Sequence, residues 1–289
     1  MKKVAILTDS TAYIPTTEMQ KYPIFSVPLG VIWGSDSFED GVNLAPHEFY
    51  ERLKTAKVMP TTSQPSVGKM QEVMNELLAR DYDILGIFIS SKLSGTLQSA
   101  IQAKSMLLSG SQVQLMDSET TTLALGFQVL AAARAAAQGA SLDECGPIAQ
   151  KARQNSGVFF MVDTLEFLHR GGRIGGAQRF LGTALKLKPI LYIREGKIES
   201  LDRVRTKGKA LERLVELVQE KCTGSSSLHL AGVHANALDD TQWMMENAIE
   251  KMNPVETFTA ELSPAIGAHV GPGTVALAYM TSDGPRSKL

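Results

Sequence analysis

The chain has 289 residues, and its 29 basic and 30 acidic side chains nearly cancel to a net charge of -1. This balance leaves no overall basic footprint of the kind expected for a nucleic-acid-binding protein. Hydrophobic residues make up 44% and charged residues 20%, which is typical of a globular chain with a full core. The two cysteines, Cys145 and Cys222, lie far apart, which argues against a disulfide framework and for a reducing compartment.

No targeting or membrane segment is predicted. The apolar run at residues 4–7 is far too short for the core of a signal peptide. No stretch of about 18 apolar residues occurs, and the longest candidate, residues 123–137, is interrupted by Gln128 and Arg134. We therefore expect a soluble, cytoplasmic protein.

In the first half of the chain, short apolar runs alternate with helical patterns. Strands are predicted over residues 4–7, 84–89 and 112–116. Helices are predicted over residues 70–78, 97–108 and 121–138, and Gly139 stands where a C-cap glycine is usual. Strands separated by helices predict right-handed β-α-β units and a parallel sheet.

The second half has a different pattern. Strands are predicted over residues 158–162, 189–193, 228–233, 257–262 and 274–280, and helices over residues 211–222 and 245–252. Glu195-Gly196 is typical of a tight hairpin turn after the second of these strands. The fold class is therefore α/β, with an N-terminal parallel-sheet α/β domain (residues 1–155) and a C-terminal mixed-sheet α+β domain (residues 156–289).

Two hydroxyl-rich segments precede predicted helices. Thr62, Ser63 and Ser66 lie just ahead of the helix at residues 70–78, where the free N–H groups of a first turn attract anions. Ser94 and Gly95 follow the strand at residues 84–89, at the edge where parallel sheets bind ligands. The alternative for both segments is simple helix capping.

Two glycine-rich segments carry basic side chains. Arg170 and Arg173 lie in a loop with four glycines, and a guanidinium group suits bidentate contact with a carboxylate or phosphate. The loop matches no nucleotide-binding pattern. His269 lies among Gly267, Gly271 and Gly273, where it either faces a site or has a structural role.

Several kinds of chemistry lack support. No G-x-S-x-G elbow is present, and the five histidines show no metal-ligand spacing, so neither a catalytic residue nor a metal site is predicted. Asp9-Ser10-Thr11 is interpreted as a turn that caps the next helix, rather than as a nucleotide or metal site.

Five segments, taken in order, resemble the DegV family, the fatty-acid-binding proteins of bacteria. The matching segments are residues 6–12 (ILTDSTA), 62–66 (TSQPS), 93–100 (LSGTLQSA), 170–174 (RGGRI) and 266–273 (IGAHVGPG). They span nearly the whole chain. Each segment alone is weak, whereas the ordered set is specific.

The resemblance implies two α/β domains with one long-chain fatty acid between them and no cofactor. It also implies a partner, the ATP-binding subunit of a fatty acid kinase, which phosphorylates the bound carboxylate to an acyl phosphate for phospholipid synthesis. On this reading the chain is a carrier and no enzyme by itself, with no nucleic-acid partner and only transient contact with a membrane.

The resemblance also implies residue roles. Thr62 and Ser94 would hydrogen-bond the carboxylate, with Ser63 and Gly95 in the same wall. His269 would approach the head group, partly through water, and Arg170 would lie near the pocket mouth as a kinase-docking or charge-balancing residue. Thr61 departs from the family pattern, because a basic residue is common there in relatives.

Two other functions remain open. A lipid-binding regulatory or sensor protein would need the same pocket as a carrier. A stand-alone acyl hydrolase would need Ser94 and His269 in direct hydrogen-bond contact, with a third group to orient the imidazole.

Overall fold

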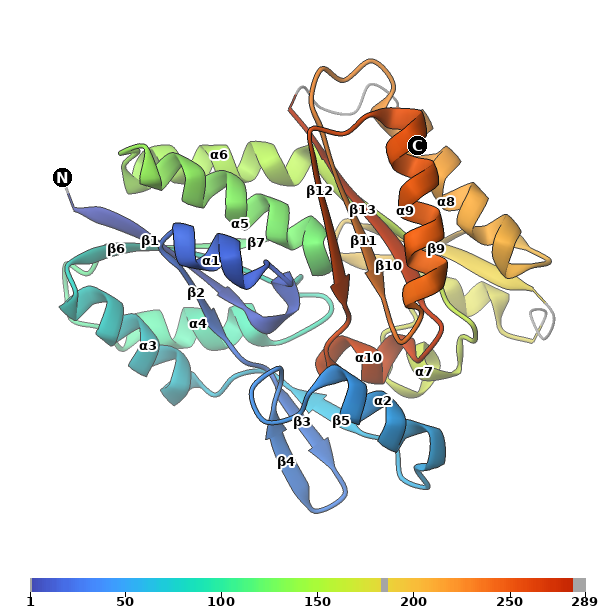
Figure 1. Cartoon of the computed structure of the whole chain (residues 1–289). Coiled ribbons are helices and arrows are strands. Elements are labelled where there is room, and N and C mark those ends of the chain that lie inside the picture. The colour runs from blue at the N-terminus through green and yellow to red at the C-terminus, as the bar shows by residue number, and fades with distance from the viewer. Residues whose placement is uncertain (1, 183–186, 283–289) are drawn as a thin grey trace.

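The computed structural model describes residues 2–182 and 187–282, and the strands of this part form three sheets (Figure 1). The N-terminal sheet is parallel throughout, in the order β2-β1-β6-β7. Its strands are β1 (Lys3–Asp9), β2 (Ile24–Val27), β6 (Tyr82–Phe88) and β7 (Val113–Asp117). The three strands predicted here are confirmed to within two residues, and the parallel sheet with them.

The second sheet is mixed, in the order β10-β9-β8-β13-β11-β12, and only β11 and β12 pair in parallel. Its strands are β8 (Ser156–Met161), β9 (Lys188–Arg194), β10 (Lys197–Val204), β11 (Leu228–His234), β12 (Glu256–Glu261) and β13 (Val275–Thr281). Glu195 and Gly196 join β9 to β10, both with the positive φ that a tight hairpin turn requires. The mixed-sheet prediction and the hairpin are confirmed.

A third sheet, which the hydrophobic patterns do not predict, is antiparallel with the order β4-β3-β5. Its strands are β3 (Gly30–Trp33), β4 (Asp36–Glu39) and β5 (Thr61–Ser63). They have three or four residues each, too few for a period to show. Helix α2 (Pro46–Thr55) packs Phe49 against Trp33, with ring centroids 5.3 Å apart.

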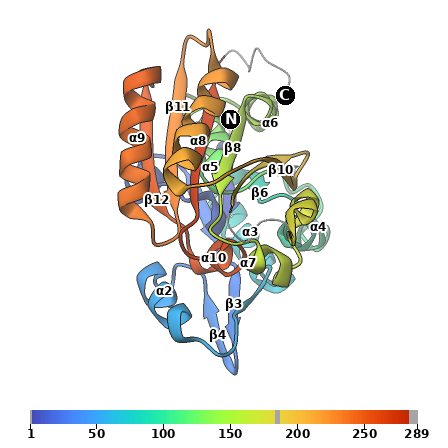
Figure 2. The same cartoon turned by 90° about the vertical axis from the view of Figure 1, so that its right-hand side faces the viewer.

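The helices cover the sheets in layers (Figures 1 and 2). The longer ones are α3 (Val67–Ala79), α4 (Thr96–Ser105), α5 (Thr122–Ala137), α6 (Leu142–Gln154), α8 (Lys207–Cys222) and α9 (Leu238–Met252). The shorter ones are η1 (Ser10–Ala12), α1 (Thr16–Lys21), α7 (Glu166–Arg170), η2 (Gly175–Phe180) and α10 (Pro264–Val270). Helices α3 and α4 lie against the parallel sheet, and α8 and α9 lie on the outer face of the mixed sheet.

The observed helix ends agree with the predictions from the sequence in two places and differ from them in one. Asp9 accepts hydrogen bonds from the backbone N–H and hydroxyl of Thr11, which confirms the predicted capping turn at η1. Gly139 follows α5 with φ of 95°, as a C-cap glycine does. The helix predicted to reach residue 108 ends instead at Ser105, and Leu108 is 86% exposed.

Helix α5 forms the central layer, because it contacts β1 on one side and β8, β11 and β13 on the other. It is apolar around most of its circumference, which suits a helix buried on both faces. Gly126 permits part of this packing, since a Cβ atom there would clash with the carbonyl oxygen of Ala12. One hydrophobic cluster includes α5 residues together with both the mixed and the three-stranded sheets. The division at residues 155 and 156 therefore stays a proposal.

A buried carboxylate ties three distant segments together. Asp40, which follows β4, is 2% exposed and accepts hydrogen bonds from Ser10 Oγ (2.7 Å), Ser263 Oγ (2.7 Å) and the backbone N–H of Ala265 (2.9 Å). Burial raises the pKa of the Asp40 carboxyl group, and these hydrogen bonds oppose that rise. The carboxylate thereby holds the start of α10 against η1 and the three-stranded sheet.

An ion pair joins α5 to the far strand of the mixed sheet. Arg134 contacts both carboxylate oxygens of Glu256, at 2.6 and 3.1 Å, and His229 Nδ1 lies 2.9 Å from the same carboxylate. Burial raises the pKa of Glu256, but the hydrogen bonds from His229 and Arg134 outweigh it and lower the pKa to about 2.

We expect Glu256→Gln to lower the free energy of unfolding by about 3 kcal/mol near neutral pH. The folded-state pKa of about 2 lies below the ordinary value of 4.5, so this stabilisation is present above pH 4.5. It is lost as the pH falls through about 2, and the variant and the wild type should converge there. Urea unfolding at a series of pH values measures the difference.

Glu51→Gln is the matched control, because Glu51 pairs with Lys54 in an exposed ion pair on one helix. Such pairs contribute about 0–1 kcal/mol. If both variants lose the same small amount at every pH, the ion pair of Glu256 does not stabilise the junction.

Candidate functional site

A cavity of about 830 Å³, its open mouth included, lies where the loops at the carboxyl ends of the parallel strands face the mixed sheet. Most of its wall is apolar and consists of Leu29, Ile89, Leu93, Val158, Phe160, Leu168, Ile193, Ile198, Leu262, Ala265, Ile266, Val270 and Ala276. Its polar members are Thr62, Ser63, Gln64, Ser94, Thr121, Thr122, Arg173, His269 and Thr274. The cavity thus suits an apolar ligand with a small polar part.

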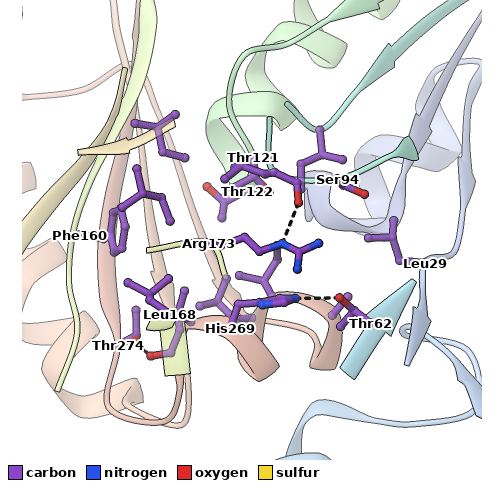
Figure 3. A pocket seen from close by; sticks show the side chains of 18 of the residues that line it. Leu29, Thr62, Ser94, Thr121, Thr122, Phe160, Leu168, Arg173, His269 and Thr274 are labelled. Atoms are coloured by element: carbon purple, nitrogen blue, oxygen red, sulfur yellow. Dashed lines mark hydrogen bonds between the residues drawn. The ribbon is translucent and has the colours of Figure 1, made fainter. Parts of the chain in front are cut away.

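The closest polar contact in this wall joins Thr62 to His269, which are 207 residues apart. Thr62 lies on β5, opposite Val31 of β3, and His269 lies on α10. Thr62 Oγ1 and His269 Nε2 are 2.7 Å apart, as Figure 3 shows. The unpredicted third sheet is therefore the element that carries Thr62 to the histidine.

The imidazole of His269 is neutral at physiological pH. Burial and, to a smaller extent, the nearby positive charge of Arg173 together lower the pKa of His269 to about 4. The histidine therefore adds no charge to the cavity. It acts as a hydrogen-bonding group.

The surroundings of His269 favour one tautomer. Its Nδ1 has no hydrogen-bond partner among the described residues and lies against Gly171, where a Cβ atom would overlap with it. A buried N–H without a partner is rarer and more costly than a free lone pair, so the proton belongs on Nε2. Nε2 then donates to Thr62 Oγ1, which leaves the Thr62 hydroxyl proton free to donate to a ligand.

Ser94 lies in the same cavity but does not contact the histidine. Its Oγ is 2.9 Å from Thr96 Oγ1 and 3.4 Å from the backbone nitrogen of Thr96, a weak cap of α4. Acyl hydrolysis would need Ser94 bonded to His269 and a third group on Nδ1. His269 instead bonds Thr62, and its Nδ1 has no partner within the described residues. This geometry does not provide a serine nucleophile.

Arg173, and not Arg170, lines the cavity. Arg173 donates from Nε to the carbonyl oxygen of Leu93 (3.2 Å) and from a terminal nitrogen to that of Gly171 (2.7 Å). Arg170 pairs with Glu166 at 2.6 Å, and 54% of its side chain is exposed. The two arginines of the glycine-rich loop thus face different surroundings, which their sequence spacing does not reveal.

The other predicted residues divide between the cavity and its support. Ser63 lines the cavity, whereas Gly95 is not among the lining residues. Gly95 packs closely against Gln64, because a Cβ atom added at Gly95 would lie 3.0 Å from Cδ of Gln64. Ser66 is the residue that caps α3, through the backbone N–H of Lys69. This segment therefore contributes hydroxyl groups both to the cavity wall and to the cap of a helix, from different residues. Thr61 is exposed.

Four polar lining residues are not among the predicted site residues, namely Gln64, Thr121, Thr122 and Thr274. The sequence carries a signal for Thr121 and Thr122, because they follow β7 at the same sheet edge as Ser94 follows β6. Gln64 lies inside a segment whose predicted anion site depends on its hydroxyl groups.

The described residues contain neither a candidate metal-ligand cluster nor a candidate membrane-spanning helix. Residues 2–182 and 187–282 contain no group of three or more His, Cys, Asp or Glu side chains that is able to hold a metal ion. In the same part of the chain, no helix combines the length and apolar character needed to cross a membrane.

Comparison with known proteins places these features in a family. Residues 3–282 match the family model described as "Uncharacterised protein, DegV family". The chain belongs to the DegV family. A DegV domain-containing protein of Halalkalibacterium halodurans is 35% identical over 280 residues, which cover 96% of this chain and 99% of the relative.

Solved DegV structures share the whole fold. A DegV family protein from Thermus thermophilus, described by its fatty acid binding, has a TM-score of 0.91 and 32% identity over 96% of this chain and 99% of its own. DegV of Bacillus subtilis, described as a fatty acid binding protein, has a TM-score of 0.89 and 33% identity over 98% of this chain and 100% of its own. The resemblance to the DegV family is confirmed, together with the expected α/β fold that contains a parallel and a mixed sheet.

We expect Gly171→Ala to displace His269 from Thr62 in this DegV-family chain. Gly171 has an ordinary φ of -72°, so alanine fits the backbone there, and only the added Cβ overlaps with the imidazole. The displaced ring gains solvent, and the pKa of His269 should rise from about 4 toward 6.5. NMR titration of the histidine side chains measures this pKa.

Gly208→Ala is the control, because a Cβ atom at Gly208 meets nothing within 4 Å. It should leave the titration of His269 as in the wild type. A pKa near 4 in both variants would show that Gly171 does not position the ring.

Proposed function

We propose that this chain binds one long-chain fatty acid in the cavity and presents its carboxylate to the ATP-binding subunit of a separate fatty acid kinase. It then carries the acyl phosphate toward phospholipid synthesis. The observation that supports this most is a largely apolar cavity with a neutral histidine and hydroxyl groups at one part of its wall. DegV proteins of known structure that are described as fatty-acid-binding support the ligand class.

The apolar wall accounts for affinity. Burying an acyl chain contributes about 0.8 kcal/mol per methylene group, so a long chain gains on the order of 10 kcal/mol before the entropic costs of binding. The polar contacts are then needed for orientation more than for strength.

The polar part of the wall holds a carboxylate without neutralising it fully. Thr62 and Ser94 supply hydroxyl donors, and the neutral His269 orients the Thr62 hydroxyl. Arg173 supplies the one positive charge among the lining residues that the structure describes. A carboxylate held mainly by hydroxyl groups keeps its nucleophilic oxygen available to a phosphoryl donor.

The kinase partner accounts for what the chain does not contribute. The glycine-rich loop of this chain matches no nucleotide-binding pattern, so we assign ATP binding to the partner. Arg170 lies in the same loop as Arg173, and its side chain is exposed. We assign it to partner docking or charge balance. Action in the cytoplasm, with transient membrane contact to collect or deliver lipid, follows from this role.

We expect mass spectrometry of lipid extracted from gently purified protein to find one long-chain fatty acid per chain. The apolar cavity should retain the tail through purification, because each buried methylene group contributes about 0.8 kcal/mol to the binding free energy. Protein stripped of lipid should take up octadecanoate on incubation. The absence of any acyl chain before and after incubation would refute the binding proposal.

We expect Thr62→Ala combined with Ser94→Ala to retain the tail but to reduce acyl-phosphate formation with a kinase subunit at least tenfold. The double variant removes two hydroxyl donors while leaving the apolar wall intact. Fatty acid affinity and kinase turnover are measured in parallel, and the variant should still bind the fatty acid because the apolar wall supplies most of the affinity.

Thr61→Ala combined with Ser91→Ala is the matched control, since both hydroxyls are exposed and outside the cavity lining. Unchanged turnover in the Thr62 and Ser94 variant would refute the head-group assignment. Binding without any turnover in the wild type would favour the sensor role over the carrier role.

A further inference from the structure

Three consecutive threonines, the last of which is the first residue of α5, have buried side chains. Thr120, Thr121 and Thr122 are 5%, 7% and 5% exposed, and none of their Oγ1 atoms has a hydrogen-bond partner among the described residues. Thr121 and Thr122 line the cavity, whereas Thr120 does not. A buried hydroxyl without a partner destabilises a protein relative to a methyl group of the same shape. Two such hydroxyls on a cavity wall therefore point to a polar ligand atom there.

The backbone around these threonines is also unusual. Thr121 is the N-cap residue of the 16-residue helix α5, but its side chain makes no cap hydrogen bond. Thr122 has φ of 58°, a left-handed conformation that is rare for a β-branched residue. The first-turn N–H groups of α5 add partial positive charge to the same end, which favours an oxygen atom nearby.

This pair is separate from the polar group formed by Thr62 and His269. In the view of Figure 3, Arg173 lies between Thr121 and Thr122 on one side and the Thr62–His269 pair on the other. Side chains of the apolar wall, such as Phe160, line the same cavity. A carboxylate bound at Thr62 therefore leaves Thr121 and Thr122 to face another part of the ligand.

We propose that Thr121 and Thr122 form a second polar subsite that binds a hydroxyl group on the acyl chain, so that the cavity accepts a hydroxylated fatty acid. This inference rests on the proposed function, since it specifies the class of fatty acid. A threonine hydroxyl both donates and accepts, and so does an alcohol. One threonine donates to the ligand hydroxyl and the other accepts from it. An acyl chain without a hydroxyl group leaves both threonines without partners.

The test compares the affinities of octadecanoate and of monohydroxy-octadecanoates with the hydroxyl at successive positions. They are measured on the full chain, stripped of lipid, as wild type and as the variant Thr121→Val with Thr122→Val. Valine keeps the shape and the β-branch and removes only the hydroxyl. For at least one positional isomer, the ratio of its affinity to that of octadecanoate should fall at least tenfold in the variant, because two hydrogen bonds are lost.

Thr120→Val is the matched control, because it removes an equally buried hydroxyl that does not line the cavity. It should leave the ratio as in the wild type. Thr121→Ser with Thr122→Ser keeps both hydroxyls and should restore the preference, which separates the hydroxyls from an effect on folding.

The outcomes separate this inference from the proposed function. If octadecanoate binds and the ratio is the same in wild type and valine variant for every isomer, the second subsite is refuted and fatty acid binding stands. If octadecanoate and every isomer lose affinity equally, the threonines hold the carboxylate and the inference is again refuted. If no acyl chain binds the wild type, the proposed function fails and this inference with it.

Discussion

The Asp40 carboxylate is the contact on which the site depends. Removing a carboxylate from water costs several kcal/mol unless its oxygens are hydrogen-bonded. Asp40 meets that condition with donors from two distant segments, the hydroxyl of Ser10 and two groups at the start of α10, Ser263 and Ala265. Because α10 also carries His269, the same three bonds that satisfy the carboxylate set where the imidazole lies. Loss of any one donor would leave a buried charge partly unpaired and free α10 to move.

In the proposed function, the cavity divides binding between two kinds of interaction. The apolar wall would provide the free energy, which grows with the length of the buried chain and has no preferred direction. Thr62, His269 and Ser94 would provide direction, and burial keeps the imidazole neutral so that it would not hold a carboxylate as an ion pair. A carrier needs this division, because its ligand must be retained by the tail while its carboxylate stays reactive.

Helix α5 connects the architecture to the cavity. Its buried faces separate the two large sheets, and toward its C-terminal end Arg134 is bonded to Glu256 on the outermost strand of the mixed sheet. Its N-terminal end opens on the cavity through Thr121 and Thr122. The helix is thus held rigidly from both sides, which allows hydroxyls without partners to persist at its start. Packing of the whole core offsets the cost of keeping them.

Local patterns in the chain were sufficient for three strands of the parallel sheet and five strands of the mixed sheet, because strands of five or more residues and amphipathic helices leave periods that a single sequence displays. They did not predict the four-residue strand β2. For Thr62, Ser63, Ser94 and His269 they left helix capping or a structural role open, and the resemblance to the DegV family assigned these residues to the ligand site. All four line the cavity. Local patterns also did not predict the three-stranded sheet, whose strands are too short to show a period. Nor did they distinguish Arg173 from its neighbour in the glycine-rich loop. Which side chain of that loop faces the cavity depends on how α7 packs against α10, and that contact between residues about a hundred positions apart leaves no trace in either segment alone.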